Sequence, residues 1–584
     1  MQSVDFTTLS ASCHEIGNQW IPARLEQVYQ LNRFALVLGL RTLEKRGWLM
    51  LSWHPQAARI CMGNPPPRHP DTFTFSEQLR HQLKGFALTQ IAFTAPWERV
   101  IDLQFAHRPH EPAQWHLYLE VMGKYSNVIL TTAQQQIISV AHQVTTAQST
   151  IRTVETGQPY QLPPALTTTE PSLKESFNQW QERISLIPDL LKRQLWKNYR
   201  GVSPVLAQGL LEAADIDPMQ KSDALSDQDW RRLFQCWQKW LQMLETGNFQ
   251  PGWTNNGYSV VGWGITDSVE SVQVLLQIYY ENQLNQVEFQ EIKQKIGNKV
   301  SNLLKKLYQK QENFQLRLQK SKDAEEVRQQ ADLLMAHLQA IDPGMSSISL
   351  ADFATGKPIK IPLNPEKSPV QNAQHLYKRH QKLKRSRAAI TPLLQATETE
   401  IDYLQRVEAS LDQLECFNSS EDLLALKEIQ TELIAQGYLS LKHYASKVIV
   451  DHESLPRQYL SPSGLSVWVG RNNRQNDQLT FRTATESDLW FHAQEIAGSH
   501  VLLRLSSGEQ AGEEDLQFAA NLAALYSRAR QSEAVPVVYT RPKYVYKPKG
   551  AKPGTVVYKR EQLLWGKPEQ ARKSQQKKTK INFS

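Results

Sequence analysis

Short apolar runs in the first 145 residues predict β-strands, because they are rich in β-branched and aromatic residues and are bounded by polar turns. The predicted strands are FALVLGLRT (34–42), GWLMLSWH (47–54), ARICMG (58–63), VIDLQFA (100–106), SNVILTT (126–132) and IISVAHQ (137–143). FSEQLRHQLKG at 75–85 instead has the spacing of an amphipathic helix. ETGQPYQLPP at 155–164 carries the Gly and Pro residues that mark a domain exit. We therefore expect an α+β domain over 1–175.

Helical periodicity follows over 176–275, and the string KNYRGVSPVLAQGLL at 197–211 interrupts it with a turn. One helix is expected to end before Gly201, Ser203 can cap the next, and Pro204 lies in the first turn of that helix. Such a helix-hairpin-helix can present backbone N–H groups to a phosphate, or it can be only a packing corner. The sequence favours neither interpretation.

Two long helical segments, 282–341 and 372–415, carry apolar residues at three- and four-residue steps, the pattern of a coiled-coil seam. The seam residues are Ile296, Val300, Leu303, Leu307, Ile401, Leu404, Val407, Leu411 and Leu414. Between the segments, ISLADFATGKPIKIPLNP predicts a hairpin that turns at Gly356. We expect an antiparallel coiled-coil arm over 280–445 with a tip hairpin near 342–371. About sixty helical residues would extend roughly 90 Å, so the arm would provide reach.

The last part of the chain returns to an α+β pattern. Its predicted strands are SKVIVDHE (446–453), SVWVG (466–470), HVLLRL (500–505) and PVVYT (536–540), with a helix EDLQFAANLAALYSRAR at 514–530. We place this domain at 446–565 and expect 566–584 to be a basic, disordered tail. The predicted fold class is multidomain α+β, with a helix-hairpin-helix and a long antiparallel coiled coil between two α+β domains.

The charge distribution points to an anionic partner. A chain of 584 residues is too long for one hydrophobic core. Residues 541–584 hold thirteen Lys or Arg and two Glu, a net charge of +11, whereas the whole chain carries +8 and the rest therefore −3. A basic end of this kind favours a polyanionic partner over a merely solvated Lys-rich tail.

The cysteines and the apolar runs indicate the cellular compartment of the protein. No CxxC pair is formed by Cys13, Cys61, Cys236 and Cys416, which argues against a disulfide framework and against a thiolate zinc site. The sequence shows no secretory signal and no apolar run of eighteen residues. We expect a soluble cytoplasmic protein without a membrane partner.

Enzyme motifs are missing from the sequence. It contains neither GxxxxGK[ST] nor GxSxG. His492 and His500 lie eight residues apart with no Cys or third His nearby, so we expect no metal site. Asp488 and His492 could pair as acid and base, but no nucleophile accompanies them, and we expect them to fix a loop. We predict no catalytic residue, no cofactor and no enzyme activity.

Basic residues mixed with amides and rings suit RNA, because Arg and Lys bind phosphates while rings stack on bases. This mixture occurs in GRNNRQND at 470–477 and in the tyrosine- and lysine-rich stretch 539–560. Of Trp490 and Phe491, we expect one in the core and leave the other open. YKRHQKLKRSR at 377–387 carries six basic residues and no acid, which favours phosphate contact over a solvated face. The expected RNA contacts are Arg471, Asn472, Asn473, Arg474, Lys378, Arg379, Lys382, Lys547 and Lys549.

Several of these strings resemble one family. GRNNRQND, DLWFHA and GSHV, followed by YTRPKYVYKPKGAKPG, resemble the NFACT-R domain. EVMGKYSNVILTT at 120–132 and LSWHPQAARI at 51–60 resemble the NFACT-N domain. The helical hairpin and the coiled coil lie between them, in the family's domain order. The sequence is thus identified as a member of the NFACT family, the RqcH/NEMF-type ribosome quality control factors, also labelled fibronectin-binding protein A-like.

The resemblance implies a protein that binds the large ribosomal subunit carrying a stalled peptidyl-tRNA. It would recruit charged tRNA, in bacteria mainly alanyl-tRNA, for untemplated addition of residues to the C-terminus of the nascent chain, which marks that chain for degradation. Peptide-bond formation would belong to ribosomal RNA, so the protein would be a recruiter and not an enzyme. The resemblance also implies a cytoplasmic, ribosome-associated location and a small S4-like RNA-binding helper such as RqcP. The nine expected contacts listed above would then face rRNA or the ribosome.

The family's tRNA-handling residues are an early Asp and an Asp-Arg pair in the N domain. By resemblance they fall on Asp5 and on Glu98-Arg99, where the acid is one methylene longer than usual. A milder departure is Ala497, which precedes GSHV where the family often has Pro.

Two other functions are considered. The first domain resembles the N domain of formamidopyrimidine-type DNA glycosylases, which use a Pro amine exposed after Met removal. This chain begins Met1-Gln2-Ser3, so glycosylase chemistry is not expected. The alternative is a cell-surface fibronectin-binding adhesin, which would need an export signal or a wall anchor.

Overall fold

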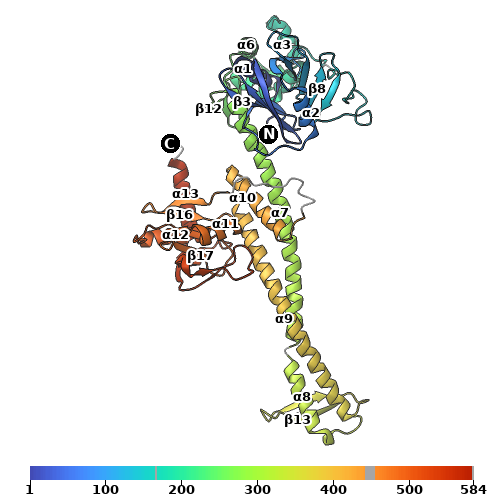
Figure 1. Cartoon of the computed structure of the whole chain (residues 1–584), viewed down its shortest axis with the longest axis vertical. Helices are drawn as coiled ribbons and strands as arrows, with labels where there is room; N and C mark the ends of the chain where they lie inside the picture. The colour runs from blue at the N-terminus through green and yellow to red at the C-terminus, as the bar shows by residue number, and fades with distance from the viewer. Residues whose placement is uncertain (165–166, 322, 441–453, 582–584) are drawn as a thin grey trace. The chain divides into compact units, whose positions relative to one another are not determined.

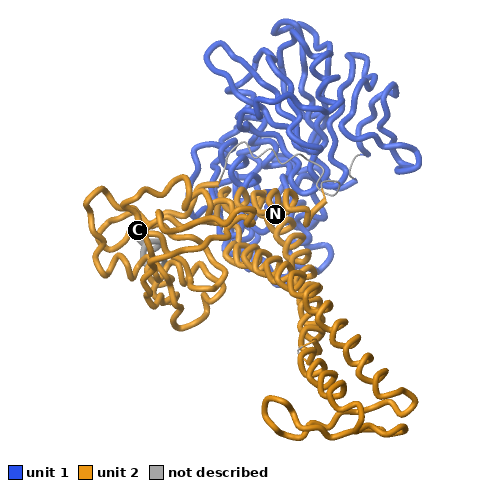
Figure 2. Tube along the Cα trace, turned by 60° about the horizontal axis from the view of Figure 1, so that its bottom comes forward, with its two compact units in different colours: residues 1–284 blue, residues 285–584 orange. Residues whose placement is uncertain are grey.

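A computed structural model of the chain describes residues 1–164, 167–321, 323–440 and 454–581 (Figure 1). The chain divides into two compact units, Met1–Leu284 and Asn285–Ser584, coloured separately in Figure 2. The strand predicted at 446–453 lies outside the described residues. In the described part of the chain, no helix combines the length and the apolar character needed to span a membrane.

The first unit contains a nine-stranded antiparallel sheet in the order β4-β3-β2-β1-β5-β6-β7-β8-β9. Its strands are β1 (Ala23–Asn32), β2 (Ala35–Arg41), β3 (Arg46–Ser52), β4 (Arg59–Gly63), β5 (Ala87–Phe93), β6 (Val100–Ala106), β7 (Trp115–Glu120), β8 (Asn127–Thr132) and β9 (Ile137–Val140). The six predicted strands and the helix α2 (Thr74–Gln82) are confirmed. The strands β1, β5 and β7 were not predicted, because polar residues such as those of ARLEQVYQLN dilute their apolar positions.

Helices pack beside this sheet around a core of large aromatic residues. They are α1 (Phe6–Trp20), α3 (Phe177–Ser185), α4 (Leu191–Asn198), α5 (Pro204–Ala213) and α6 (Asp227–Thr246), with short 3-10 turns η1 (Gly123–Tyr125) and η2 (Ser222–Ala224). Trp180, Trp237 and Trp240 are fully buried here. The predicted helix-hairpin-helix is confirmed in α4 and α5, since Gly201 has a φ of 71° and Ser203 caps α5. A small sheet of β10 (Gly252–Thr254), β11 (Gly257–Ser259) and β12 (Asp267–Ser268) follows.

The predicted antiparallel arm is formed by α7 (Val272–Lys320) and α9 (Pro369–Gln413) (Figure 1). Two contacts show that α7 and α9 are antiparallel: Lys293 donates to the Glu415 carbonyl, and Gln311 donates to Glu398. A later residue of α7 thus contacts an earlier residue of the α9 segment. The seam residues predicted on α9 pack with Ile296 of α7 and with a further helix, α10 (Ser420–Ala435).

The distal part of the arm has a core of its own. It contains α8 (Ala324–Ala336), η3 (Leu338–Ala340) and the predicted tip hairpin of β13 (Ser347–Ala351) and β14 (Pro358–Pro362). Ala331, Leu334, Ile361 and Leu376 are among the buried residues that join these elements to α9. The tip is therefore a packed module and not a bare turn.

The C-terminal domain is a six-stranded antiparallel sheet covered by a helix. The sheet order is β15-β16-β18-β17-β19-β22, and α12 (Glu513–Leu525) supplies six buried alanines and leucines to the core. The remaining elements are β15 (Arg457–Leu460), β16 (Ser466–Val469), α11 (Asn473–Gln478), a π-turn η5 (Leu479–Thr483), β17 (Leu489–Ala493), β18 (Val501–Leu503), β19 (Val535–Thr540), η6 (Pro542–Tyr544), β20 (Val545–Tyr546), β21 (Val557–Tyr558), β22 (Gln562–Gly566) and α13 (Pro568–Ile581).

The structure differs from the prediction at the C-terminal end, where disorder was expected over 566–584. Residues Pro568–Ile581 form the helix α13. Pro568 suits a first helical turn, and Glu569 pairs with Lys573 at 3.6 Å one turn later. Ala571 is 1 % exposed and belongs to the core that α12 lines. This apolar contact could not be read from a segment whose composition is otherwise polar.

Candidate nucleic-acid interface

Asp5 joins the N-terminal ends of two helices. Its Oδ1 accepts the backbone N–H of Thr8 at 2.8 Å and caps α1. Its Oδ2 accepts the hydroxyl of Ser203 at 2.6 Å, and the Ser203 Oγ accepts the N–H of Leu206 at 3.0 Å to cap α5. Each helix N-terminus carries a partial positive charge. Two positive helix ends therefore converge on one carboxylate.

We call Asp5 and the N-terminal ends of α1 and α5 the joint at Asp5. The loop before β6 packs against this joint through Trp97, which has a φ of 60°. The ring of Trp97 packs on Phe6 and Trp240, at centroid distances of 4.9 Å and 5.6 Å. A Cβ on Gly201 would lie 2.6 Å from the Trp97 ring. The turn between α4 and α5 therefore approaches the loop as closely as a glycine allows.

Arg99 lies in the same loop, and its Nη1 donates to the carbonyl of Val4 at 3.5 Å. The structure thus brings together Arg99 and Asp5, which are far apart in the sequence. No ion pair joins Glu98 to Arg99 within the described residues, and there the buried Oε1 of Glu98 has no hydrogen-bond partner. A buried carboxylate oxygen in this state is suited to accept a hydrogen bond from a ligand.

A cleft of about 920 Å³ opens beside Asp5. It is lined from α1, α5, the β10–β11 hairpin and the start of α7, mainly by carboxamides and aromatic rings. Its principal side chains are Gln2, Gln208, Asn255, Asn256, Trp253 and Trp263. Of the residues described, no Lys or Arg lines it. Carboxamides both donate and accept, and rings offer stacking faces, so the cleft suits base edges better than phosphates.

Three of the expected RNA contacts in the C-terminal domain are turned inward. The guanidinium of Arg471 pairs with Asp422 at 2.6 Å, and its Nε donates to the Leu455 carbonyl at 2.8 Å. Asn472 and Asn473 are buried. These side chains therefore fasten the domain to α10 and do not face solvent.

The two asparagines serve buried acids of α10. Asn472 donates to Glu428 at 2.6 Å, and Asn473 donates to Glu432 at 3.2 Å. Burial raises the pKa of Glu432, which also accepts the hydroxyl of Tyr403 at 2.8 Å. A buried carboxylate needs such donors, and this need explains why the amides point inward.

Two residues of the Trp-Phe-His string on β17 are internal, and the third, His492, is half-buried. Trp490 and Phe491 are both fully buried, so both are core residues, where the sequence had left one of them open. Burial lowers the pKa of His492 to about 4 and the pKa of His500 well below its usual range. Both rings are therefore neutral near pH 7. Among the described residues, no group of three His, Cys, Asp or Glu could hold a metal ion.

Asp488 fixes a loop, as predicted. Its Oδ2 accepts the N–H of Thr485 at 2.7 Å and its Oδ1 accepts the N–H of Leu505 at 3.0 Å. Its carboxylate also pairs with Arg504 at 3.2 Å. With these partners Asp488 is a structural residue.

The basic segment on the arm is exposed. Lys378, Arg379 and Lys382 on α9 lie on the surface, as do Lys384 and Arg385. None of the five forms an ion pair within the described part of the chain. The segment therefore offers unneutralised positive charge along one helix.

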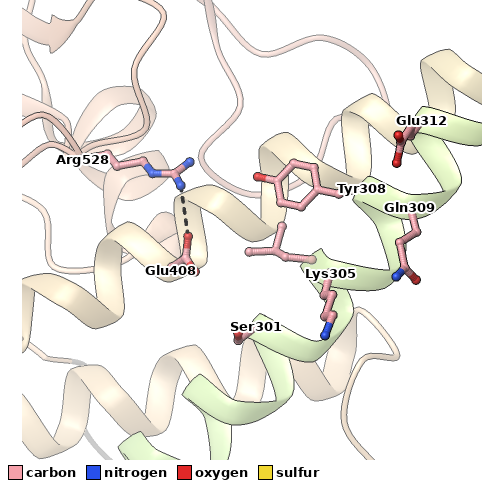
Figure 3. Close-up of a pocket in the computed structure, with 8 residues that line it drawn as sticks. Ser301, Lys305, Tyr308, Gln309, Glu312, Glu408 and Arg528 are labelled. Carbon is pink, nitrogen blue, oxygen red and sulfur yellow. Dashed lines mark ion pairs between the residues drawn. The ribbon is translucent and has the colours of Figure 1, made fainter. Parts of the chain in front are cut away.

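A shallow pocket of about 400 Å³ lies between α7, α9 and the segment after α12 (Figure 3). It is less suited to phosphate than the basic segment on α9. Lys305 and Arg528 line it together with Glu312 and Glu408, and Arg528 pairs with Glu408 at 3.7 Å. The charges balance, so an anion gains little there.

The surface of the C-terminal domain that remains open was not singled out from the sequence. Phe481 is 40 % exposed, and Arg482 beside it is also exposed. Both lie with the expected Arg474 and Lys547 around a second pocket of about 400 Å³. Lys549 is exposed on the loop that contains Lys547. In the sequence, Gln478 and Arg482 are four residues apart with Phe481 between them, and this helical spacing is the feature that could have indicated the open surface.

Comparison with known proteins gives matches along most of the chain. Residues 5–448 match the family described as NFACT N-terminal and middle domains, and residues 456–560 match the NFACT protein RNA binding domain. The chain is 29% identical over 552 residues to "Rqc2 homolog RqcH" of Streptococcus suis, covering 93% of this chain and 94% of the relative. It is 28% identical over 576 residues to "Rqc2 homolog RqcH" of Bacillus subtilis, covering 95% and 96%.

One solved structure that resembles the chain is the C-terminal part of the fibronectin/fibrinogen-binding protein from Streptococcus suis. The identity is 32%, the TM-score is 0.38, and the match covers 49% of this chain and 98% of that one.

Proposed function

The chain belongs to the NFACT family, and we propose that it acts as a ribosome-associated quality control factor. It binds the large ribosomal subunit that carries a stalled peptidyl-tRNA and recruits charged tRNA, alanyl-tRNA in the first place. Untemplated tailing of the nascent C-terminus then marks that chain for degradation. Support comes from two relatives named "Rqc2 homolog RqcH", each aligned over more than nine-tenths of both chains.

The observation that carries the proposal is the joint at Asp5. Asp5 and Arg99 are 94 positions apart in the sequence, yet both lie at the start of α1 beside the capped end of α5. An arginine next to two helix N-termini suits a phosphate, because all three favour negative charge. Glu98 adds a hydrogen-bond acceptor for an amino or hydroxyl group, and the neighbouring cleft adds amides and rings for bases.

The roles of the other expected contacts divide between binding and support. Lys378, Arg379 and Lys382 would contact rRNA of the large subunit, and Arg474, Lys547 and Lys549 would contact RNA from the C-terminal domain. Arg471, Asn472 and Asn473 would hold that domain on α10 and act on RNA only through it.

The protein would supply no chemistry of its own. In this proposal the ribosome forms each peptide bond, and the chain positions the charged tRNA. The same proposal places it in the cytoplasm with the ribosome and includes a small S4-like RNA-binding helper such as RqcP.

The test is to isolate ribosome-bound complexes of wild type and Arg99→Ala and to sequence the tRNA they hold. Loss of a charge-assisted contact corresponds to about 1.5–3 kcal/mol, so tRNA recovery with Arg99→Ala should fall at least about ten-fold. Binding to the large subunit should persist, because other surfaces carry it.

The matched control is Arg108→Ala, which removes an exposed arginine from the turn between β6 and β7. It should leave tRNA recovery unchanged. Equal recovery from Arg99→Ala and wild type would show that the joint does not bind tRNA.

A further inference from the structure

One face of α11 and η5 is open to solvent while the other is buried. The exposed residues Arg474, Gln478, Phe481 and Arg482 follow one another at steps of four, three and one. Residues between them, such as Asn476 and Leu479, are buried. The open face therefore places an aromatic ring between two arginines.

The backbone under this face is irregular. The N–H of Ala484 donates to the carbonyl of Leu479 at 2.9 Å, a five-residue step that defines a π-turn. π-Turns are rare and frequently lie at functional sites. A single exposed Phe is ordinary on a protein surface. Phe481 differs because it lies in this turn and beside a pocket with basic walls.

A basic loop is clamped over the same face by Asp477. The carboxylate of Asp477 accepts the Lys547 ammonium and, at 3.2 Å, the backbone N–H of Gly554. A Cβ on Gly554 would lie 2.6 Å from the Asn473 side chain, so the loop and α11 are in close contact. Asp477 therefore holds Lys547 at the mouth of the pocket.

The pocket between the loop and the face measures about 400 Å³. This lies near the lower end of ligand pockets, about 300–1,000 Å³, and suits one small organic group. Its lining includes Arg474, Arg482 and Lys547, with Asp477 as the one acid. Lys547 is paired with Asp477, so the exposed Arg482 supplies the positive charge that favours an anion, and the Phe481 ring favours a flat aromatic one.

We infer that this pocket holds one unpaired nucleotide of an RNA strand. The base stacks on Phe481, and the adjoining phosphates lie against Arg474, Arg482 and Lys547. Base stacking on a side-chain ring is independent of sequence and requires a base that has left its helix. The inference rests on the proposed function in that it names the RNA element taken by the C-terminal domain. An acidic peptide would use the same cations but has no need of the ring.

The experiment uses the full-length chain and a hexanucleotide containing 4-thiouridine, without ribosomes. After photo-crosslinking and trypsin digestion, the wild type should carry the nucleotide on the peptide Gln475–Arg482. With Phe481→Leu the crosslink should disappear and affinity should fall about ten-fold, the effect of about one stacking contact. Phe481→Tyr keeps the ring and should restore both.

Charge is tested separately. Arg482→Gln should reduce the slope of log affinity against log salt by about 0.7, the value of one phosphate contact on a single strand. Phe481→Leu should leave that slope unchanged. Gln478→Glu places an acid on the same exposed face without touching the core, and it should weaken binding even if Phe481→Leu unfolds the domain.

The matched control is Trp565→Leu, since Trp565 is 57 % exposed on β22 of the same domain. It should keep wild-type affinity. The inference is overturned by a crosslink elsewhere, by an unchanged Phe481→Leu, by equal loss with Trp565→Leu, or by equal competition from an oligo-glutamate peptide. Loss of tRNA from ribosomal complexes with an intact Gln475–Arg482 crosslink would concern the joint at Asp5 and not this pocket.

Discussion

Gly201 is the residue through which the turn between α4 and α5 fits the Trp97 ring. Its φ of 71° would cost an alanine about 1–2 kcal/mol, and the new Cβ would meet the ring at 2.6 Å. We predict that Gly201→Ala lowers the free energy of unfolding of the first unit by about 2 kcal/mol or more and weakens tRNA recovery, because the ring or the turn must move. Denaturant unfolding of the full chain measures the first effect.

Gly17→Ala is the comparison for this substitution. Gly17 lies inside α1, and a Cβ there meets nothing within 4 Å. Alanine should therefore stabilise the helix by about 0.5–1 kcal/mol. Equal effects of the two substitutions would mean that the Trp97 contact does not constrain the turn.

At this scale the sequence was informative where the signal is local. The cap at Ser203 and the end of a helix before Gly201 follow from residue types at neighbouring positions, and both are confirmed. The contact of Arg99 with Val4 is not local, since 95 positions separate the two residues. Only the family resemblance linked Arg99 with Asp5 before the fold was known.

Among the elements, α11 depends on α10 for its position. Asn472 caps α11 through the Gln475 N–H at 2.9 Å and also donates to the buried Glu428. We predict that Asn472→Ala destabilises the C-terminal domain by about 2 kcal/mol, since a cap is worth about 1 kcal/mol and an unpaired buried acceptor costs about 1–3 kcal/mol. The salt slope of RNA binding by the folded variant should stay at the wild-type value. A shallower slope would show that Asn472 contacts the RNA after all.

The elements that the sequence predicted well have a clear period. The apolar runs of the first sheet and the seams of α7 and α9 could be recognised without tertiary information. The burial of the string GRNNRQND could not be predicted, because its asparagines bind Glu428 and Glu432, about forty positions earlier on another helix. The polarity of the string indicated an exposed surface, whereas the two buried acids require the asparagines as internal hydrogen-bond donors.

At the scale of the whole molecule, the arm consists of two separately packed parts, so one part can be removed without exposing the core of the other. Residues 296–304 of α7 pack with 401–411 of α9, whereas the distal core joins α8, the tip hairpin and the first half of α9. The pair Gln311 and Glu398 lies between the two cores. The arm can therefore be divided just beyond this pair, after Phe314 and before Gln395.

We predict that replacing 315–394 by four Gly or Ser residues leaves the core between 296–304 and 401–411 folded, because four residues span the roughly 8–10 Å between packed helices. Large-subunit co-sedimentation should fall, since the exposed Lys378, Arg379 and Lys382 are removed with the tip. The Gln475–Arg482 crosslink should persist.

Changing only the three cations to Gln keeps the length of the arm and separates the contribution of the charges from that of the distal module. If this variant binds as weakly as the excision, the charges carry the contact; if it binds like wild type while the excision does not, the distal module itself does. Full co-sedimentation by both would leave the arm without a ribosomal contact.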